Sequence, residues 1–221
     1  MVNKKIISRY NEDVSWIDFD DTIIFNKGEH LKSNIETINL PNAGREAQTW
    51  TYYIINNYQN LPDICFFIQA NPFDHSEDIK KRLLVDYKYP TPLTYRYTKL
   101  WPGKEKTKYD LCFEVNNLKV RMGNINYFGH KNFQATQSWF ANCWNEIFKC
   151  KVPSNYYYGY GAMWAVPKKF ILNRSLNFWN NINELLLKST NEAYQSTIDA
   201  WAMEALWAAV FSSPDVYPSI K

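Results

Sequence analysis

The stretch that most restricts the fold of this chain runs from residue 40 to residue 75, LPNAGREAQTWTYYIINNYQNLPDICFFIQANPFDH. In its first half, apolar residues such as Trp50 and Ile54 recur at three- and four-residue steps, which predicts an amphipathic helix. A turn at residues 60–62 follows, and the apolar run at residues 64–68 then predicts a short buried strand. A helix that leads directly into a buried strand is typical of an α/β sheet.

Polar residues gather directly behind the predicted strand, at Gln69, Asn71, Asp74 and His75. In open α/β sheets, ligands bind outside the carboxyl ends of the strands. We therefore expect these side chains to belong to a site.

The start of the predicted helix carries residues that suit an anion. Asn42 can cap its first free amides, and Gly44 allows a ligand or another segment of the chain to approach closely. Exposed amides at a helix start attract anions, and Arg45 adds a bidentate donor for phosphate or carboxylate. The competing interpretation is an ordinary capped helix with an Arg45–Glu46 pair at its surface. Residue types alone favour this second interpretation.

The remaining chain predicts further strands and helices. Strands are predicted at residues 4–9, 22–25 and 162–166, a hairpin at 111–122, a short helix within 75–84, and longer helices at 139–148, 167–187 and about 196–211. Residues 123–137 predict a long polar loop, of the kind that carries function. The alternation of strands and helices favours one α/β domain over residues 1–221, with a central, mostly parallel but mixed sheet flanked by helices.

The charge and the cysteine content of the chain indicate which cellular compartment and which classes of partner to expect. The formal net charge is only +3, with Lys and Arg spread among Asp and Glu, so the basic stripe of a nucleic-acid-binding protein is missing. The four cysteines form no C-x-x-C pair, and Cys65 lies within the apolar strand, where a buried free thiol is usual. The sequence has no apolar run long enough for a signal peptide or a membrane span. We expect a cytoplasmic protein with no nucleic-acid partner and no membrane span.

Aromatic residues make up 17% of the chain and include nine Trp. Stacking on such rings is one way to hold sugars or bases, so some of them are expected to line a site. The competing interpretation is a tightly packed aromatic core, and composition leaves both open.

The acidic segment Asp18-Phe19-Asp20-Asp21-Thr22 has the D-x-D-x-T pattern of the nucleophile loop in haloacid-dehalogenase-like phosphatases. That loop should follow a buried apolar strand, whereas residues 13–17 are few and polar. The later sequence also offers no acidic pair in a loop for the remaining metal ligands. The segment favours an acidic turn, and a phosphatase is the minor alternative.

Several ordered blocks together resemble a widespread family of fungal, plant, bacterial and viral proteins of unknown function. These blocks are S-R-Y-N-E-D-V-S-W, N-K-G, N-A-G-R-E-A-Q-T-W, N-L-P-D-I-C-F-F-I-Q-A-N-P-F-D-H, G-A-M-W-A-V-P-K-K and M-E-A-L-W. They cover nearly the full length of the chain. The G-R-E and Q-x-x-P-x-D-H blocks are the most specific among them.

The order of these blocks is similar to that of GT-A glycosyltransferases, which move a sugar from a nucleoside diphosphate to a hydroxyl group. The resemblance implies a GT-A-like fold and a nucleotide-sugar donor, with a UDP-sugar favoured. The nucleotide-binding residues that it implies are Arg9, Tyr10, Asn11, Glu12, Asn26, Lys27, Asn42, Gly44, Arg45, Gln69 and Asn71.

The same resemblance implies a second half of the site that holds a saccharide or glycoconjugate acceptor. The implied contacts to the acceptor or the sugar are Tyr158, Gly161, Met163 and Trp164. The implied general base is an acid on the last helix, Glu204 or Asp199, because such a carboxylate can deprotonate the acceptor hydroxyl.

The chain departs from the family pattern at the metal-binding D-x-D motif. Gln69-Ala70-Asn71 stands in its place, and these amides are weak ligands for Mn²⁺ or Mg²⁺. Either Asp74 and His75 supply the contacts to a divalent cation, or cationic side chains such as Arg9, Lys27 and Arg45 neutralise the leaving diphosphate. The third alternative is that the chain has lost the transfer step and only binds.

The leading hypothesis is therefore a glycosyltransferase. The alternative from another class is a non-catalytic carbohydrate-binding protein that uses the tyrosine run at residues 156–160 and the Trp residues. A haloacid-dehalogenase-like phosphatase that uses Asp18 and Asp20 comes third.

Overall fold

The structure is a computed structural model that describes residues 2–94, 112–115, 118–124, 137–152, 155–158, 161–189 and 198–212. Its elements in chain order are β1 (Asn3–Arg9), β2 (Thr22–Asn26), β3 (Thr37–Asn39), α1 (Arg45–Asn57), β4 (Ile64–Gln69), α2 (Ile79–Arg82), β5 (Thr91–Pro92), β6 (Cys112–Val115), β7 (Leu118–Asn124), α3 (Gln137–Phe148), β8 (Asn155–Tyr158), β9 (Trp164–Pro167), α4 (Lys168–Leu172), α5 (Leu176–Leu187) and α6 (Ala200–Val210).

A six-stranded sheet in the order β3-β2-β1-β4-β9-β5 forms the centre of the fold. Strands β1, β2, β3 and β4 are parallel, whereas β9 runs antiparallel to both of its neighbours. The prediction of a mostly parallel, mixed sheet with flanking helices is confirmed. The chain moves outward from β1 to β3 and returns with β4 on the other side of β1. This reversal makes a topological switch point between β1 and β4.

A second, three-stranded sheet joins β6, β7 and β8 in antiparallel pairs. The β6–β7 pair confirms the predicted hairpin over its described residues. Strand β8 was missed, because the tyrosine run that forms it lacks the alternation of apolar and polar residues by which a half-buried strand is recognised. The predicted loop at residues 123–137 lies mostly outside the described residues.

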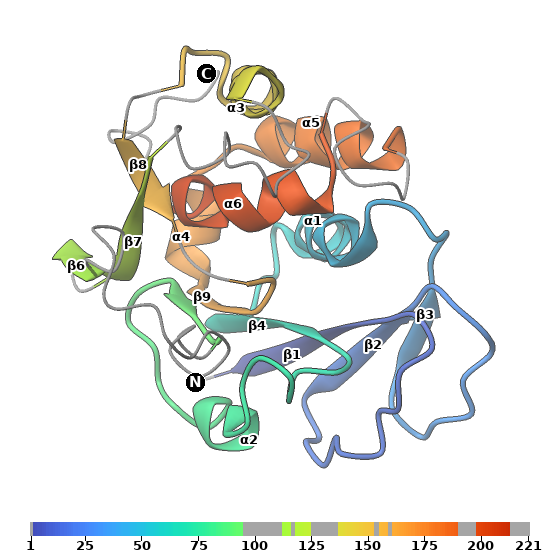
Figure 1. Cartoon of the computed structure of the whole chain (residues 1–221). Coiled ribbons are helices and arrows are strands. Elements are labelled where there is room, and N and C mark those ends of the chain that lie inside the picture. Colours follow the sequence, from blue (N-terminus) through green and yellow to red (C-terminus); the bar gives the residue numbers. More distant parts are fainter. Residues whose placement is uncertain are drawn as a thin grey trace.

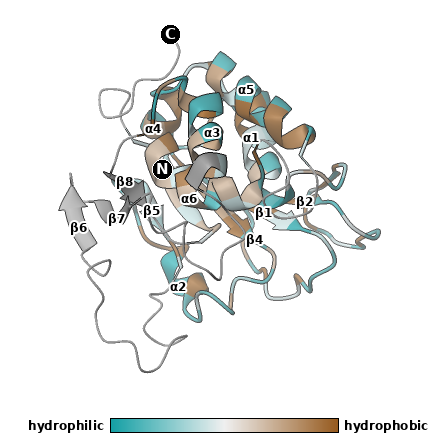
Figure 2. Ribbon diagram, turned by 45° about the horizontal axis from the view of Figure 1, so that its top comes forward, coloured by the Kyte–Doolittle hydropathy of each residue, from teal (hydrophilic) through white to brown (hydrophobic). Residues whose placement is uncertain are grey.

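The helices lie in layers on the two faces of the central sheet. Figure 1 shows α1, α3, α5 and α6 over one face and the short α2 on the other. In Figure 2 the hydrophobic colour marks β4 and much of the helices that pack against the sheet. Among the described helices, none has the length and apolar character that crossing a membrane requires.

Side chains alternate between the two faces along each strand. In β4, Cys65 and Phe67 pack against the large helices, and Phe66 and Ile68 face the other side, where α2 and loops cover them. Cys65 is a buried free thiol, as predicted.

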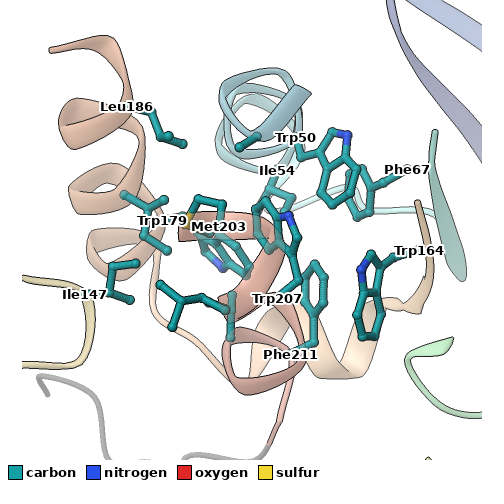
Figure 3. Close-up of a cluster of buried hydrophobic side chains, with 14 of the residues drawn as sticks. Trp50, Ile54, Phe67, Ile147, Trp164, Trp179, Leu186, Met203, Trp207 and Phe211 are labelled. Carbon is teal, nitrogen blue, oxygen red and sulfur yellow. The ribbon is translucent and has the colours of Figure 1, made fainter. Parts of the chain in front are cut away.

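Aromatic rings fill the layer between α1, α6 and the sheet. Figure 3 shows Trp50, Phe67, Trp207 and Phe211 together there, and the centroid of the Trp207 ring lies 4.7 Å from that of Trp50 and 5.3 Å from that of Phe211. Trp50, Trp144, Trp164, Trp179 and Trp207 are all fully buried. For these tryptophans, the aromatic-core interpretation is the correct one.

One predicted helix is broken in the structure. The helix expected over residues 167–187 divides into α4 and α5, and Ser175 caps α5 by accepting a hydrogen bond from the Phe178 amide at 3.2 Å. The break turns Arg174 inward, where its fully buried guanidinium donates to the carbonyls of Ala209 and Val210 at 3.1 Å. These carbonyls end α6, so the break in one helix stabilises the end of another.

We expect Trp207→Ala to lower the free energy of unfolding by about 3–5 kcal/mol, because it leaves a cavity in the ring layer. Urea denaturation followed by fluorescence measures this change. The control is Leu84→Ala, since Leu84 is 74% exposed and its loss should change the free energy by no more than about 0.5 kcal/mol. Equal effects of the two substitutions would contradict the assignment of Trp207 to the core.

Candidate functional site

A cavity of about 710 Å³ opens at the carboxyl ends of β1 and β4, the switch point of the sheet. It is lined by Ser8, Arg9, Tyr10, Glu12, Lys27, Asn42, Arg45, Glu46, Gln69, Asn71, Asp74, His75, Thr94, Gly161, Ala162 and Glu204. Most of the residues that the sequence singled out therefore meet here, although they come from distant parts of the chain. Asn11, Asn26, Gly44, Met163, Trp164 and Asp199 are not among the lining residues, and the side chain of Tyr158 lies outside the described part.

Arg9, at the end of β1, braces the two loops beside the cavity. Its Nε donates to the Glu12 carbonyl at 2.9 Å, and its Nη1 lies within hydrogen-bond distance of the Tyr10 and Glu29 carbonyls and of the Asn26 side chain. The buried amide of Asn26 also donates to the Glu29 carbonyl, at 3.0 Å. Both side chains thus support the loops that form the wall.

Glu12 and Asn11 also hold these loops in place. The Glu12 carboxylate accepts hydrogen bonds from the backbone amides of Tyr10 at 2.7 Å and Asn11 at 3.1 Å. The Asn11 side chain accepts from the Glu29 amide at 2.8 Å. The exposed Tyr10 ring is left at the cavity rim.

Lys27, directly after β2, is buried beneath the start of α1. Its ammonium donates to the carbonyls of Ala43 and Arg45, both at 2.6 Å, and to Gln48 Oε1 at 2.7 Å. Burial lowers the pKa of Lys27 to about 7, and the negative charge of Glu46 opposes that change.

The start of α1 differs from the predicted one. The helix begins at Arg45, and the residue at its N-cap position is Gly44, at φ 57°, in place of the expected Asn42. A Cβ at Gly44 would lie 2.9 Å from the Leu186 Cβ. The close approach that glycine permits is therefore made by helix α5, another segment of the chain.

Arg45 presents its guanidinium at the cavity from a left-handed backbone conformation, with φ 45°. The carbon at the centre of the guanidinium lies 4.3 Å from the centroid of the half-buried Trp201 ring on α6. A guanidinium over an aromatic ring makes a favourable cation–π contact, and its five N–H donors make it a good partner for an anion.

Two glutamates line the same cavity, Glu46 on α1 and Glu204 on α6. Burial raises the pKa of Glu204 to about 7, and the charge of Glu46 adds to the rise. Burial also raises the pKa of Glu46, against the opposing effect of its own backbone amide and of Arg45 and Lys27. Sequence reasoning missed Glu46, because it lies outside the apolar face of the helix and resembles a surface residue.

Gly161 lies beside Glu204 in the cavity wall. Its backbone N–H donates to the Glu204 carboxylate. Its φ is 76°, and a Cβ here would lie 2.3 Å from the Thr94 methyl group, so only glycine fits.

The polar cluster after β4 forms one wall of the cavity, as predicted. The Gln69 amide donates to the Asn71 carbonyl at 2.7 Å, and the Asn71 amide donates to Asp74 at 2.8 Å. In the part of the chain that the structure describes, no three His, Cys, Asp or Glu side chains gather as a metal site.

Three residues implied by the resemblance lie elsewhere. Asp199 is buried as the cap of α6 and accepts from the Ala202 amide at 3.0 Å. Met163 and Trp164 have fully buried side chains in the two core layers, and neither residue lines the cavity.

The acidic segment with the phosphatase-like pattern leads into the amino end of β2 and is not part of the cavity lining. Asp21 directly precedes β2 and pairs with Lys5, and Asp18 pairs with Lys80 at 3.0 Å. Because the carboxyl ends of the parallel strands hold the cavity, these acids take no part in it.

A family model described as "Protein of unknown function (DUF3431)" matches residues 6–219, so the chain belongs to this family. No curated protein and no solved structure matches the chain.

We expect the stability of the protein to depend on the protonation of Glu204. The pKa of this group rises from 4.5 to about 7 on folding, so its contribution to stability is complete below about pH 4.5 and is lost as the pH rises through 7. Relative to the wild type, Glu204→Gln should gain up to roughly 3 kcal/mol between about pH 5 and pH 8.

Urea denaturation at several pH values measures the difference. The matched control is Glu184→Gln, at an exposed position of α5 outside the cavity, which should follow the wild type at each pH. Parallel pH profiles for the wild type and Glu204→Gln would contradict a half-buried Glu204.

Proposed function

We propose that this member of the DUF3431 family transfers a sugar from a nucleoside diphosphate donor, with a UDP-sugar favoured, to a hydroxyl group of a saccharide or glycoconjugate. The observation that carries the proposal is the meeting of Arg45 and Glu204, from two different helices, in one cavity at the switch point of the sheet. The Arg45 guanidinium suits the binding of a diphosphate, and the Glu204 carboxylate suits a proton transfer.

The position and size of the cavity support the proposal. Ligands of doubly wound sheets bind at such switch points, and pockets for small molecules typically measure about 300–1,000 Å³. The cavity of about 710 Å³ falls in this range. The mixed sheet and the order of the sequence blocks along it agree with the resemblance to GT-A glycosyltransferases.

The diphosphate is best placed against Arg45. The Trp201 ring lies against the guanidinium, and the planar fork of N–H donors on an arginine pairs well with phosphate oxygens. Arg9 and Lys27 line the same cavity, but their described hydrogen bonds run to the protein's own loops. The sequence alone could not distinguish these roles, because all three side chains are cations near the same predicted site.

Glu204 is the proposed general base. Its carboxylate takes the proton of the acceptor hydroxyl, the oxygen forms a bond to the anomeric carbon, and the bond from that carbon to the diphosphate breaks. The leaving diphosphate keeps the electron pair, and Arg45 stabilises its charge. A pKa near 7 suits this step, because the base is then both available and strong enough at neutral pH. No step in this scheme requires a metal ion.

The alternatives have less support. A non-catalytic sugar-binding protein would use exposed rings, and five of the tryptophans are in the core. A phosphatase would use Asp18 and Asp20, and neither is among the residues that line the cavity.

We expect uridine diphosphate to raise the melting temperature, because a ligand of the native state stabilises it by mass action. Arg45→Ala should weaken uridine diphosphate binding by roughly 10–100-fold, the loss of a charged hydrogen bond or two. The matched control is Lys81→Ala, an exposed cation on α2, which should bind normally. If no nucleoside diphosphate shifts the melt, with or without Mn²⁺, the sugar-binding alternative gains support.

We expect Glu204→Gln to lower the rate of sugar transfer by a factor of about 10²–10⁴ and to leave uridine diphosphate binding intact, because it removes only the base. The matched control is Asp199→Asn, since asparagine also caps a helix well and Asp199 lies outside the cavity lining. A radiolabelled donor assay measures both. Transfer at the normal rate by Glu204→Gln would rule it out as the base.

A further inference from the structure

In its charged form, Lys27 has no N–H group left for a ligand. An ammonium carries three donors, and the three acceptors at Ala43, Arg45 and Gln48 lie between 2.6 and 2.7 Å from it. The side chain is also 7% exposed, so it reaches the cavity wall from below.

These acceptors surround the strained start of α1. Gly44 and Arg45 both have left-handed backbone conformations, at φ 57° and 45°. For a residue with a side chain, this conformation costs about 1–3 kcal/mol and persists only where the surroundings impose it. The carbonyls that flank Gly44, those of residues 43 and 45, converge on one point, and without a cation between them they would repel each other.

The conformation of Arg45 decides where its side chain goes. From this backbone the guanidinium reaches the Trp201 ring at 4.3 Å and lines the cavity. In an ordinary helical first turn the side chain would leave the backbone in another direction. The direction of Arg45 therefore depends on the turn that Lys27 holds.

We propose that Lys27 is a positioning residue: it sets the affinity of the cavity for a diphosphate by holding the turn that directs Arg45, and it makes no contact with the ligand. This inference rests on the proposed function for its ligand. It replaces the expectation from the sequence that Lys27 contacts the nucleotide directly.

A double-mutant cycle separates these two roles. The probe is uridine diphosphate, and its dissociation constant is measured by calorimetry for the wild type, Lys27→Met, Arg45→Met and the double variant. We expect Lys27→Met alone to weaken binding by about tenfold, and by less than about twofold when Arg45 is already Met. Additive losses would mean that Lys27 touches the ligand, and no loss in the single variant would mean that it has no part in binding. Either result overturns the proposal.

Lys5→Met is the matched control for the loss of a buried lysine. Lys5 is 6% exposed in β1 and pairs with Asp21 at the far end of the sheet. We expect this variant to lose stability and to keep its affinity for uridine diphosphate, which shows that weaker binding does not follow from a weaker fold. Weakened binding by Lys5→Met comparable to that of Lys27→Met would overturn the proposal. If Lys27→Met does not fold, Lys27→Gln, which keeps two N–H donors, takes its place in the cycle.

Hydrogen exchange tests the turn without any ligand. If the wild type does not bind uridine diphosphate, the proposed nucleotide donor is wrong. The role of Lys27 in the turn can still be measured by amide exchange over residues 43–48. We expect Lys27→Met to speed exchange in this segment relative to Lys5→Met. Unchanged exchange of these amides would contradict the proposal that Lys27 stabilises the turn, whatever the ligand is.

Discussion

The packing of α1 and α6 against one face of the central sheet is the interaction on which the rest of the structure depends. Trp50 from α1 and Trp207 from α6 stack on each other above Phe67 of β4, so the two helices and the strand share one apolar layer. Burial of large rings is the main favourable term available to a layer of this kind. It also fixes the ends of the helices. With α1 and α6 held side by side, Arg45 comes to rest on Trp201 and the two glutamates face one cavity.

Two charged groups of the interior, Arg174 and Glu204, have different roles, the first away from the cavity and the second beside it. Arg174 is fully buried, its pKa is lowered to about 10 by burial, and it binds the last carbonyls of α6. It closes a helix and faces no cavity described here. Glu204 is only half-buried, accepts one backbone hydrogen bond from Gly161, and keeps a raised pKa beside a second carboxyl group. A shifted pKa alone therefore does not locate a site. A shifted pKa supports a candidate site where the same group also lines a cavity at a switch point of the sheet.

Much of the fold was predictable because hydrophobic spacing is a local signal. The run at residues 64–68 has the length and composition of a buried strand, and β4 forms there. The site was predictable in part, since Arg45 and Gln69 stand at the ends of predicted elements and the family resemblance singled out Glu204. The break at Arg174 was not, because the residues from 167 to 187 have a helical pattern and the reason for the break lies in α6, about 35 residues further along the chain. Glu46 was missed for a similar reason, since only a neighbouring helix makes it face a cavity.

The sequence by itself determined the mixed α/β class, the strands β1, β2, β4 and β9 of the central sheet and the edge at which polar residues gather, because these follow from spacing within a few residues. Only the tertiary structure decided what each polar residue does there. Arg9, Lys27 and Arg45 are all cationic side chains in the sequence, yet the first two donate to carbonyls of nearby loops and the third lies over a ring and lines the cavity. The physical reason is that a cation's role depends on which acceptors surround it. Those acceptors come from segments that are distant in the chain and adjacent only after folding.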